Sequence, residues 1–170
     1  MTLILSGTDG LSDIDGSAAT PAIRGTDTNT GIFFPGADRI GFSEGGVQCG
    51  EFDASGNFLM NSGYGSVAVV YGCRAWVNFN GTGVVAIRAS GNVTSITDNG
   101  TGDYTVNFTT AMTDANYSAV LAARIEGSAT LANEANPSIP AKAAGSLRIT
   151  TLNSTFSSTD AGQVNVAIFR

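Results

Sequence analysis

The chain has 170 residues, which allows one domain or two small ones. Its 22 glycines, many Thr, Ser and Asn residues and a charged fraction of only 13% are typical of a turn-rich β protein and argue against long helices. A formal net charge of −6 without a Lys- or Arg-rich run argues against nucleic acid as a partner, and no apolar stretch approaches the roughly 20 residues of a membrane span. We expect an all-β protein without membrane insertion.

Residues 1–24 read as a short strand at Leu3–Leu5 followed by irregular chain with turns at Asp9-Gly10 and Asp15-Gly16. Asp9, Asp13 and Asp15 have part of the spacing of a calcium loop, but the later acidic ligand is missing. Aspartates that bond their own backbone in turns are the preferred interpretation. The sequence therefore predicts no metal and no cofactor.

Residues 25–63 contain four very short predicted strands, at Ile32–Pro35, Arg39–Ser43, Glu51–Ala54 and Asn57–Met60. Isolated strands of this length are marginal in water, because the apolar area that they bury does not offset the cost of ordering the chain. We therefore predict that this segment is ordered by side-by-side association of several copies of the chain. The apolar residues expected at these contacts are Ile32, Phe33, Phe34, Ile40, Phe42, Phe58 and Leu59.

A Gly- and Ser-rich stretch, Asn61–Ser66, reads as a linker, and the strands beyond it are longer and more regular. Tyr104, Val106 and Phe108 alternate with polar residues, which is the two-residue period of a strand with one buried face. The regular spacing predicts an antiparallel β-sandwich over residues 64–170. Its strands are expected around Val77–Phe79 and at Val84–Arg88, Val93–Thr97, Tyr104–Thr109, Tyr117–Glu126, Ser146–Leu152 and Val164–Phe169.

Two blocks resemble bacteriophage tail-fibre proteins. The first is Gly-Thr-Asp-Thr-Asn-Thr-Gly-Ile-Phe-Phe-Pro at residues 25–35 with the later Ser-Gly-Asn turn at 55–57, which is similar to fibre shaft segments. The second runs from Ser90 to Phe108 and on to Tyr117, and with residues 73–81 it resembles the C-terminal β-domains of phage and prophage fibres. Together the two blocks span most of the chain.

The resemblance implies a homotrimer on a phage particle, made in the host cytoplasm, with a short trimeric β shaft at residues 25–63. Residues 1–24 would attach to other virion proteins, and a knob at residues 64–170 would face a host cell-surface receptor. A tail or baseplate location is favoured over the capsid. Family shafts usually contain several repeats, whereas this chain has one, so a capsid-decorating cement or head-fibre protein without a receptor role is the alternative.

Recognition by a sandwich usually falls to its loops. The predicted receptor-facing loops are 98–103, 133–139 and 156–160, with Asp98, Asn99, Thr101, Asp103, Asn133, Glu134, Asn136, Phe156 and Asp160 as candidate residues. Trp76 is interpreted as a contact between copies near the linker, with a sugar-stacking platform as the alternative.

Catalysis is not expected. The chain has no histidine, so a Ser-His-Asp or Cys-His nucleophile cannot be assembled. The glutamates are scattered, and a carboxylate-based polysaccharide depolymerase is the third possibility after the two structural roles. Cys49 and Cys73 are interpreted as unpaired structural thiols.

Overall fold

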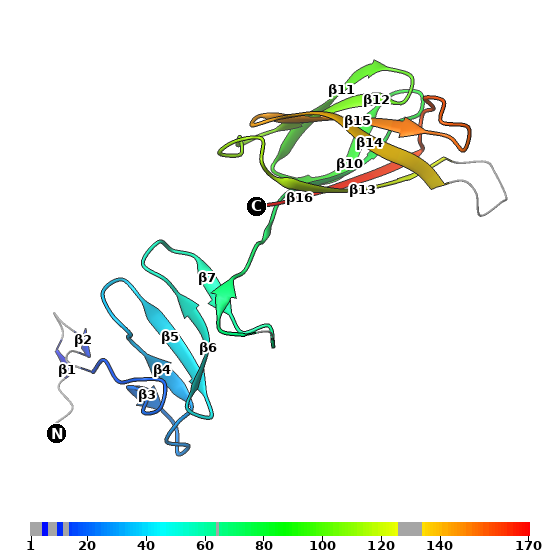
Figure 1. Cartoon of the computed structure of the whole chain (residues 1–170). Helices are drawn as coiled ribbons and strands as arrows, with labels where there is room; N and C mark the ends of the chain where they lie inside the picture. Colours follow the sequence, from blue (N-terminus) through cyan, green and yellow to red (C-terminus); the bar gives the residue numbers. More distant parts are fainter. Residues whose placement is uncertain (1–4, 7–9, 12–13, 64, 126–133) are drawn as a thin grey trace. The chain divides into compact units, whose positions relative to one another are not determined.

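A computed structural model describes residues 5–6, 10–11, 14–63, 65–125 and 134–170 (Figure 1). Within these residues all regular structure is β, and all strand pairs are antiparallel. None of the described residues belongs to a helix that could cross a bilayer. The chain divides into two compact units, Met1–Val70 and Tyr71–Arg170.

The N-terminal unit contains one sheet of six strands that follow each other in chain order. The strands are β3 (Ile23–Arg24), β4 (Gly31–Phe33), β5 (Ile40–Glu44), β6 (Val47–Phe52), β7 (Phe58–Met60) and β8 (Ala68–Val69), and a separate pair is formed by β1 (Leu5–Ser6) and β2 (Gly10–Leu11). The prediction of very short strands before residue 61 is confirmed for β3, β4 and β7, whereas β5 and β6 have the ordinary length of a strand. The sheet also continues beyond residue 63, because β8 pairs with β7.

The predicted strand at Glu51–Ala54 is wrong in its bounds. Glu51 and Phe52 end β6, and Asp53 starts the turn to β7. The Asp53 carboxylate accepts hydrogen bonds from the backbone of Ser55 and Asn57 and from the Asn57 side chain, and these bonds lower the pKa of Asp53, the side-chain bond of Asn57 most. Because these hydrogen bonds fix the turn that starts at Asp53, β6 ends at Phe52 and does not extend to Ala54.

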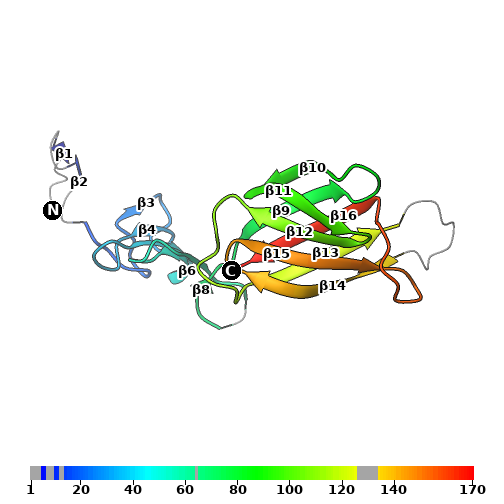
Figure 2. The ribbon, with the colours of Figure 1, turned by 90° about the horizontal axis from the view of Figure 1, so that it is seen from above.

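The C-terminal unit is one continuous eight-stranded sheet folded into two layers, a β-sandwich (Figures 1 and 2). One layer contains β10 (Ala86–Gly91), β9 (Cys73–Asn80), β16 (Gln163–Phe169) and β13 (Ser118–Arg124) in that order. The other contains β14 (Glu134–Ala143), β15 (Ser146–Leu152), β12 (Asp103–Phe108) and β11 (Val93–Gly100). The predicted all-β sandwich is confirmed.

Strand β14 was not predicted, because residues 133–139 were interpreted as a loop. It begins beside β13, at the pairs Ala123 with Ala135 and Arg124 with Glu134, and then pairs with β15. Pro137 and Pro140 suggested a loop, but Pro140 lies in the irregularity between Ser138 and Ala141, where the ladder is interrupted. Proline is tolerated in such places because no ladder hydrogen bond is lost.

The hydrophobic core lies between the two layers of the sandwich. Alternate residues of each strand point inward, as predicted for Tyr104, Val106 and Phe108. Two edge-to-face aromatic pairs, Phe79 with Tyr104 and Phe108 with Tyr117, pack inside it. The buried residues are Ala75, Val77, Phe79, Val93, Tyr104, Val106, Phe108, Met112, Tyr117, Ala123, Leu147, Ile149, Ala161, Val164, Val166 and Ile168.

Candidate functional site

Three connections gather at the end of the sandwich that is remote from Cys73, where β9 starts. They are 81–85, 101–102 and 153–162, and two of them contain predicted receptor-facing residues. Asp160 joins two of them, 153–162 and 101–102, because its Oδ1 accepts a hydrogen bond from the Gly102 backbone nitrogen at 2.7 Å; the Tyr104 hydroxyl lies 3.0 Å from the same oxygen. The structure therefore brings two of the three predicted loops together.

Tyr104 anchors this cluster from inside the core. Its hydroxyl also lies 2.8 Å from the Gly81 carbonyl oxygen, so that it links the connections 81–85 and 153–162. Burial raises the pKa of Tyr104 well above its ordinary value, and the hydrogen bond to Asp160 raises it further. The hydroxyl therefore stays protonated, and its single proton is shared between the two acceptors, the Gly81 carbonyl and the Asp160 carboxylate.

The predicted loop at 98–103 is shorter than expected. Asp98 and Asn99 belong to β11 and Asp103 begins β12, which leaves only Thr101 and Gly102 as the turn. Arg148 binds the Asp103 carboxylate through two hydrogen bonds, of 2.9 and 2.5 Å, and lowers its pKa. Asn99 donates to Asp103 as well. Asn99, Asp103 and Arg148 are thus hydrogen-bonded to each other, and we interpret them as a structural network.

The loop at 133–139 is corrected by the structure. Glu134 and Asn136 belong to the strand β14, and Asn133 lies outside the described residues. In the third loop, Phe156 is 75% exposed and stands on a turn in which the Asn153 side chain accepts backbone bonds from Thr155 and Ser157. Phe156 and the exposed Thr101 are parts of the predicted site that remain open to a ligand.

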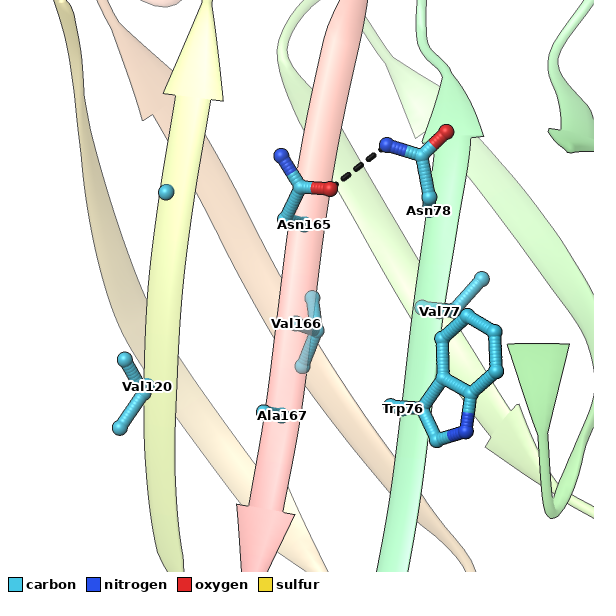
Figure 3. A pocket seen from close by; sticks show the side chains of 8 residues that line it. Trp76, Val77, Asn78, Val120, Asn165, Val166 and Ala167 are labelled. Carbon is cyan, nitrogen blue, oxygen red and sulfur yellow. Dashed lines mark hydrogen bonds between the residues drawn. The ribbon is translucent and has the colours of Figure 1, made fainter. Parts of the chain in front are cut away.

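A shallow groove lies on the outer face of the layer that contains β9, away from the predicted loops (Figure 3). We call it the Trp76 groove. Its volume is about 280 Å³, and Trp76, Asn78, Val120, Ala122, Asn165 and Ala167 line it on the outer side. The predicted receptor-facing loops lie elsewhere, and the sequence indicated this face only through Trp76 as an alternative sugar-stacking platform. The alternation of inward Ala75, Val77 and Phe79 does place Trp76 and Asn78 outside.

The N-terminal sheet also has one face that consists largely of apolar side chains. The strand register places on it Ile23, Ile32, Ile40, Phe42, Phe52, Phe58, Met60 and Val70, which we call the apolar face. Phe52 is 45% exposed and packs edgewise on Phe42 and obliquely on Phe58. Beside these rings, above Gly50, lies a hollow of about 310 Å³.

The residues predicted to contact other copies divide between the two faces of this sheet. Ile32, Ile40, Phe42 and Phe58 lie on the apolar face. Leu59 lies on the opposite face, opposite Glu51. Phe33 is only 4% exposed and covers Gly41, and Phe34 follows β4, where its backbone nitrogen donates to the Asp15 carbonyl.

Glu51 is the buried charge of the opposite face, with a side chain only 2% exposed. Arg39 donates to both of its carboxylate oxygens, at 2.5 and 2.9 Å, and Gln48 donates to one of them. The hydrogen bonds of Arg39 hold the pKa of Glu51 below its ordinary value in spite of burial. The opposite face therefore holds a buried charge that is satisfied within the sheet, beside apolar residues such as Leu59.

The carboxylates and thiols of the chain are the candidate metal ligands. Among the described residues, no group of three or more His, Cys, Asp or Glu side chains is placed to hold an ion. Asp9 and Asp13 of the partial calcium pattern lie outside the described residues. Cys49 and Cys73 are free thiols, as predicted.

Comparison with known proteins places the chain in no family. No family model matches it, and no curated protein matches it. Among solved structures it is similar to the phiAB6 tailspike, crystallised in complex with oligosaccharides of Acinetobacter baumannii surface polysaccharide, with a TM-score of 0.46 and 15% sequence identity. The match covers 90% of this chain and spans 38% of the tailspike chain.

Proposed function

We propose that this chain is a bacteriophage structural protein, a homotrimeric short tail fibre that takes part in binding the host. The sequence blocks at residues 25–57 and 73–117 resemble fibre proteins, and the apolar face of the N-terminal sheet supports self-association. Strands of two to six residues in a single layer bury too little apolar area to be stable alone.

The apolar face fits a second and a third copy of the same chain. A contiguous exposed apolar surface on a soluble protein marks an interface. The residues on this face are almost all apolar, so its partner must also be apolar, and other copies offer the same surface. Three copies that turn these faces toward a common axis would form a core that one copy lacks.

Light scattering on the purified chain of 170 residues tests the association. We expect a mass of three chains of 17.3 kDa each at micromolar concentration. Phe52→Ser introduces a hydroxyl into the apolar face and should lower the mass, whereas Val69→Ser, on the opposite face beside Leu59, is the matched control. A wild-type monomer, or equal effects of the two variants, would contradict the proposal.

Capsid decoration is the second candidate, because the six-stranded sheet of the N-terminal unit is small for a shaft. Gold-labelled antibody on intact virions separates the two locations. Label at the tail supports the fibre, and label over the head assigns the protein to the capsid.

We propose further that the protein binds without catalysing a reaction. Asp103 is paired with Arg148, and Asp160 accepts bonds from Tyr104 and Gly102, so these carboxylates already have partners. Incubation with bacterial surface polysaccharides should release no reducing ends. Time-dependent release would instead identify a depolymerase.

A further inference from the structure

The Trp76 groove has two rows of side chains that run across three strands. Trp76, Ala167 and Val120 are neighbours in one row across β9, β16 and β13. Asn78, Asn165 and Ala122 form the next row (Figure 3). The hollow forms because Ala167 and Ala122 are small. The amides of Asn78 and Asn165 lie one row away from the Trp76 indole.

The indole of Trp76 is held in place by the neighbouring strand. Gly91 on β10 is its partner in the register, and a Cβ at Gly91 would lie 2.5 Å from the indole Nε1 and 2.9 Å from Cδ1. The five-membered ring therefore occupies the space that a side chain at residue 91 would fill. Trp76 remains 44% exposed, which makes it a fixed and open aromatic surface.

The amide pair has unused hydrogen-bonding capacity. Asn78 Nδ2 donates to Asn165 Oδ1 at 2.6 Å. Within the described chain, the remaining amide oxygen of Asn78 and the amide nitrogen of Asn165 have no protein partner. Amides on the outer face of the other layer are used differently, since Asn107 donates to both Ser95 and Thr97. Asn107 is thus satisfied by neighbouring side chains, whereas the Asn78–Asn165 pair offers a free acceptor and a free donor.

We propose that the Trp76 groove binds an uncharged sugar ring of a bacterial surface polysaccharide. A pyranose has an apolar C–H face that stacks on an indole, and hydroxyls that can donate to Asn78 Oδ1 and accept from Asn165 Nδ2. No charged side chain lines the groove, which favours a neutral ring. An apolar hollow with a few placed polar groups is the usual form of a small-ligand site. The inference rests on the proposed host-binding role and names the ligand class and the residues.

Purified capsular and O-antigen polysaccharides, printed as an array, are the probes, and adhesion to whole bacterial cells is measured in parallel. Trp76 is the chain's one tryptophan, so its fluorescence reports on the groove alone when a bound polysaccharide is titrated. We expect an emission change on binding. Trp76→Ala should weaken binding about tenfold or more, Trp76→Phe should retain part of it, and Asn165→Ala should weaken it as well.

Phe156→Ala is the matched control, because it removes an exposed aromatic ring from the loop cluster instead. If Phe156→Ala loses binding and Trp76→Ala keeps it, the proposal that the Trp76 groove binds the sugar is refuted, whereas the proposed role in host binding is retained. Adhesion to cells without binding to any polysaccharide would likewise refute the groove proposal and leave host binding intact. A wild-type protein that binds neither cells nor polysaccharides overturns both proposals. If Trp76→Ala changes the mass in light scattering, the groove is a contact between subunits and the inference fails.

Discussion

At the scale of single residues, the buried carboxylate of Glu51 makes the N-terminal sheet sensitive to acid. Its pKa lies below the ordinary value because Arg39 donates to it, so the ionised form stabilises the folded state at neutral pH. This contribution is lost as the pH falls below about 4.3 through the lower pKa of the folded state.

Glu51→Gln should lower the free energy of unfolding at pH 7 by about 1–2 kcal/mol, a modest amount because part of the pair is open to solvent. The variant should also lose less stability than the wild type as the pH falls toward 3. Thermal unfolding from pH 3 to pH 7 measures both effects. Glu44→Gln, on the neighbouring strand β5 and exposed, is the control. If Glu51→Gln lost as much stability between pH 7 and pH 3 as the wild type does, this account would be contradicted.

Tyr104 has the opposite dependence on pH. Burial raises its pKa, so the protonated hydroxyl stabilises the folded state up to pH 10, and the contribution is lost as the pH rises above about 10. Tyr104→Phe removes the bonds to Gly81 and Asp160 and should cost about 1–3 kcal/mol. Chemical denaturation at pH 7 and pH 11 checks the prediction, since the difference between Tyr104→Phe and the wild type should shrink at the higher pH.

At the scale of elements, the β11–β12 hairpin depends on Gly102. Its φ of +66° is in the left-handed region, and a Cβ there would lie 2.6 Å from the Thr151 carbonyl and the Thr159 nitrogen. Gly102→Ala should therefore destabilise the sandwich by about 2–4 kcal/mol. Gly83→Ala, which has a similar φ in open space, should cost less. Equal melting temperatures of the two variants would refute a tight contact at residue 102.

Much of the sandwich could be predicted from alternation. Strands such as Tyr104–Thr109 and Ser146–Leu152 follow the two-residue period of a half-buried sheet. Strand β14 could not be predicted, because Pro137 and Pro140 interrupt its pattern and only the folded sheet shows where a missing N–H is harmless.

The candidate sites were less predictable. The position of Trp76 on the outer face follows from its buried neighbours Ala75 and Val77, but its contact with Gly91 depends on which strand pairs with β9. Asp160 joins two loops that lie 58 residues apart in sequence, at Gly102. Such contacts depend on tertiary packing, and no local pattern indicates them.

At the scale of the whole molecule, the net charge is confined to the N-terminal unit. Residues 1–70 contain eight acidic and two basic residues, whereas residues 71–170 contain six of each. If copies associate through this unit, their like charges repel, and salt screens that repulsion. We predict that the thermal stability of the oligomer rises between about 20 mM and about 500 mM NaCl. Differential scanning calorimetry measures this, and a fall in stability with salt would contradict it.

The arrangement of the sandwich has a mechanical consequence. The chain enters at the start of β9, which has ladder partners on both sides, and the connections 101–102 and 153–162 lie at the far end of the strands. A pull between these two ends runs along the strands, so the ladder bonds, which lie across them, are loaded together in shear. Because these bonds must break together and not one after another, we expect the sandwich to resist a force applied along its strands.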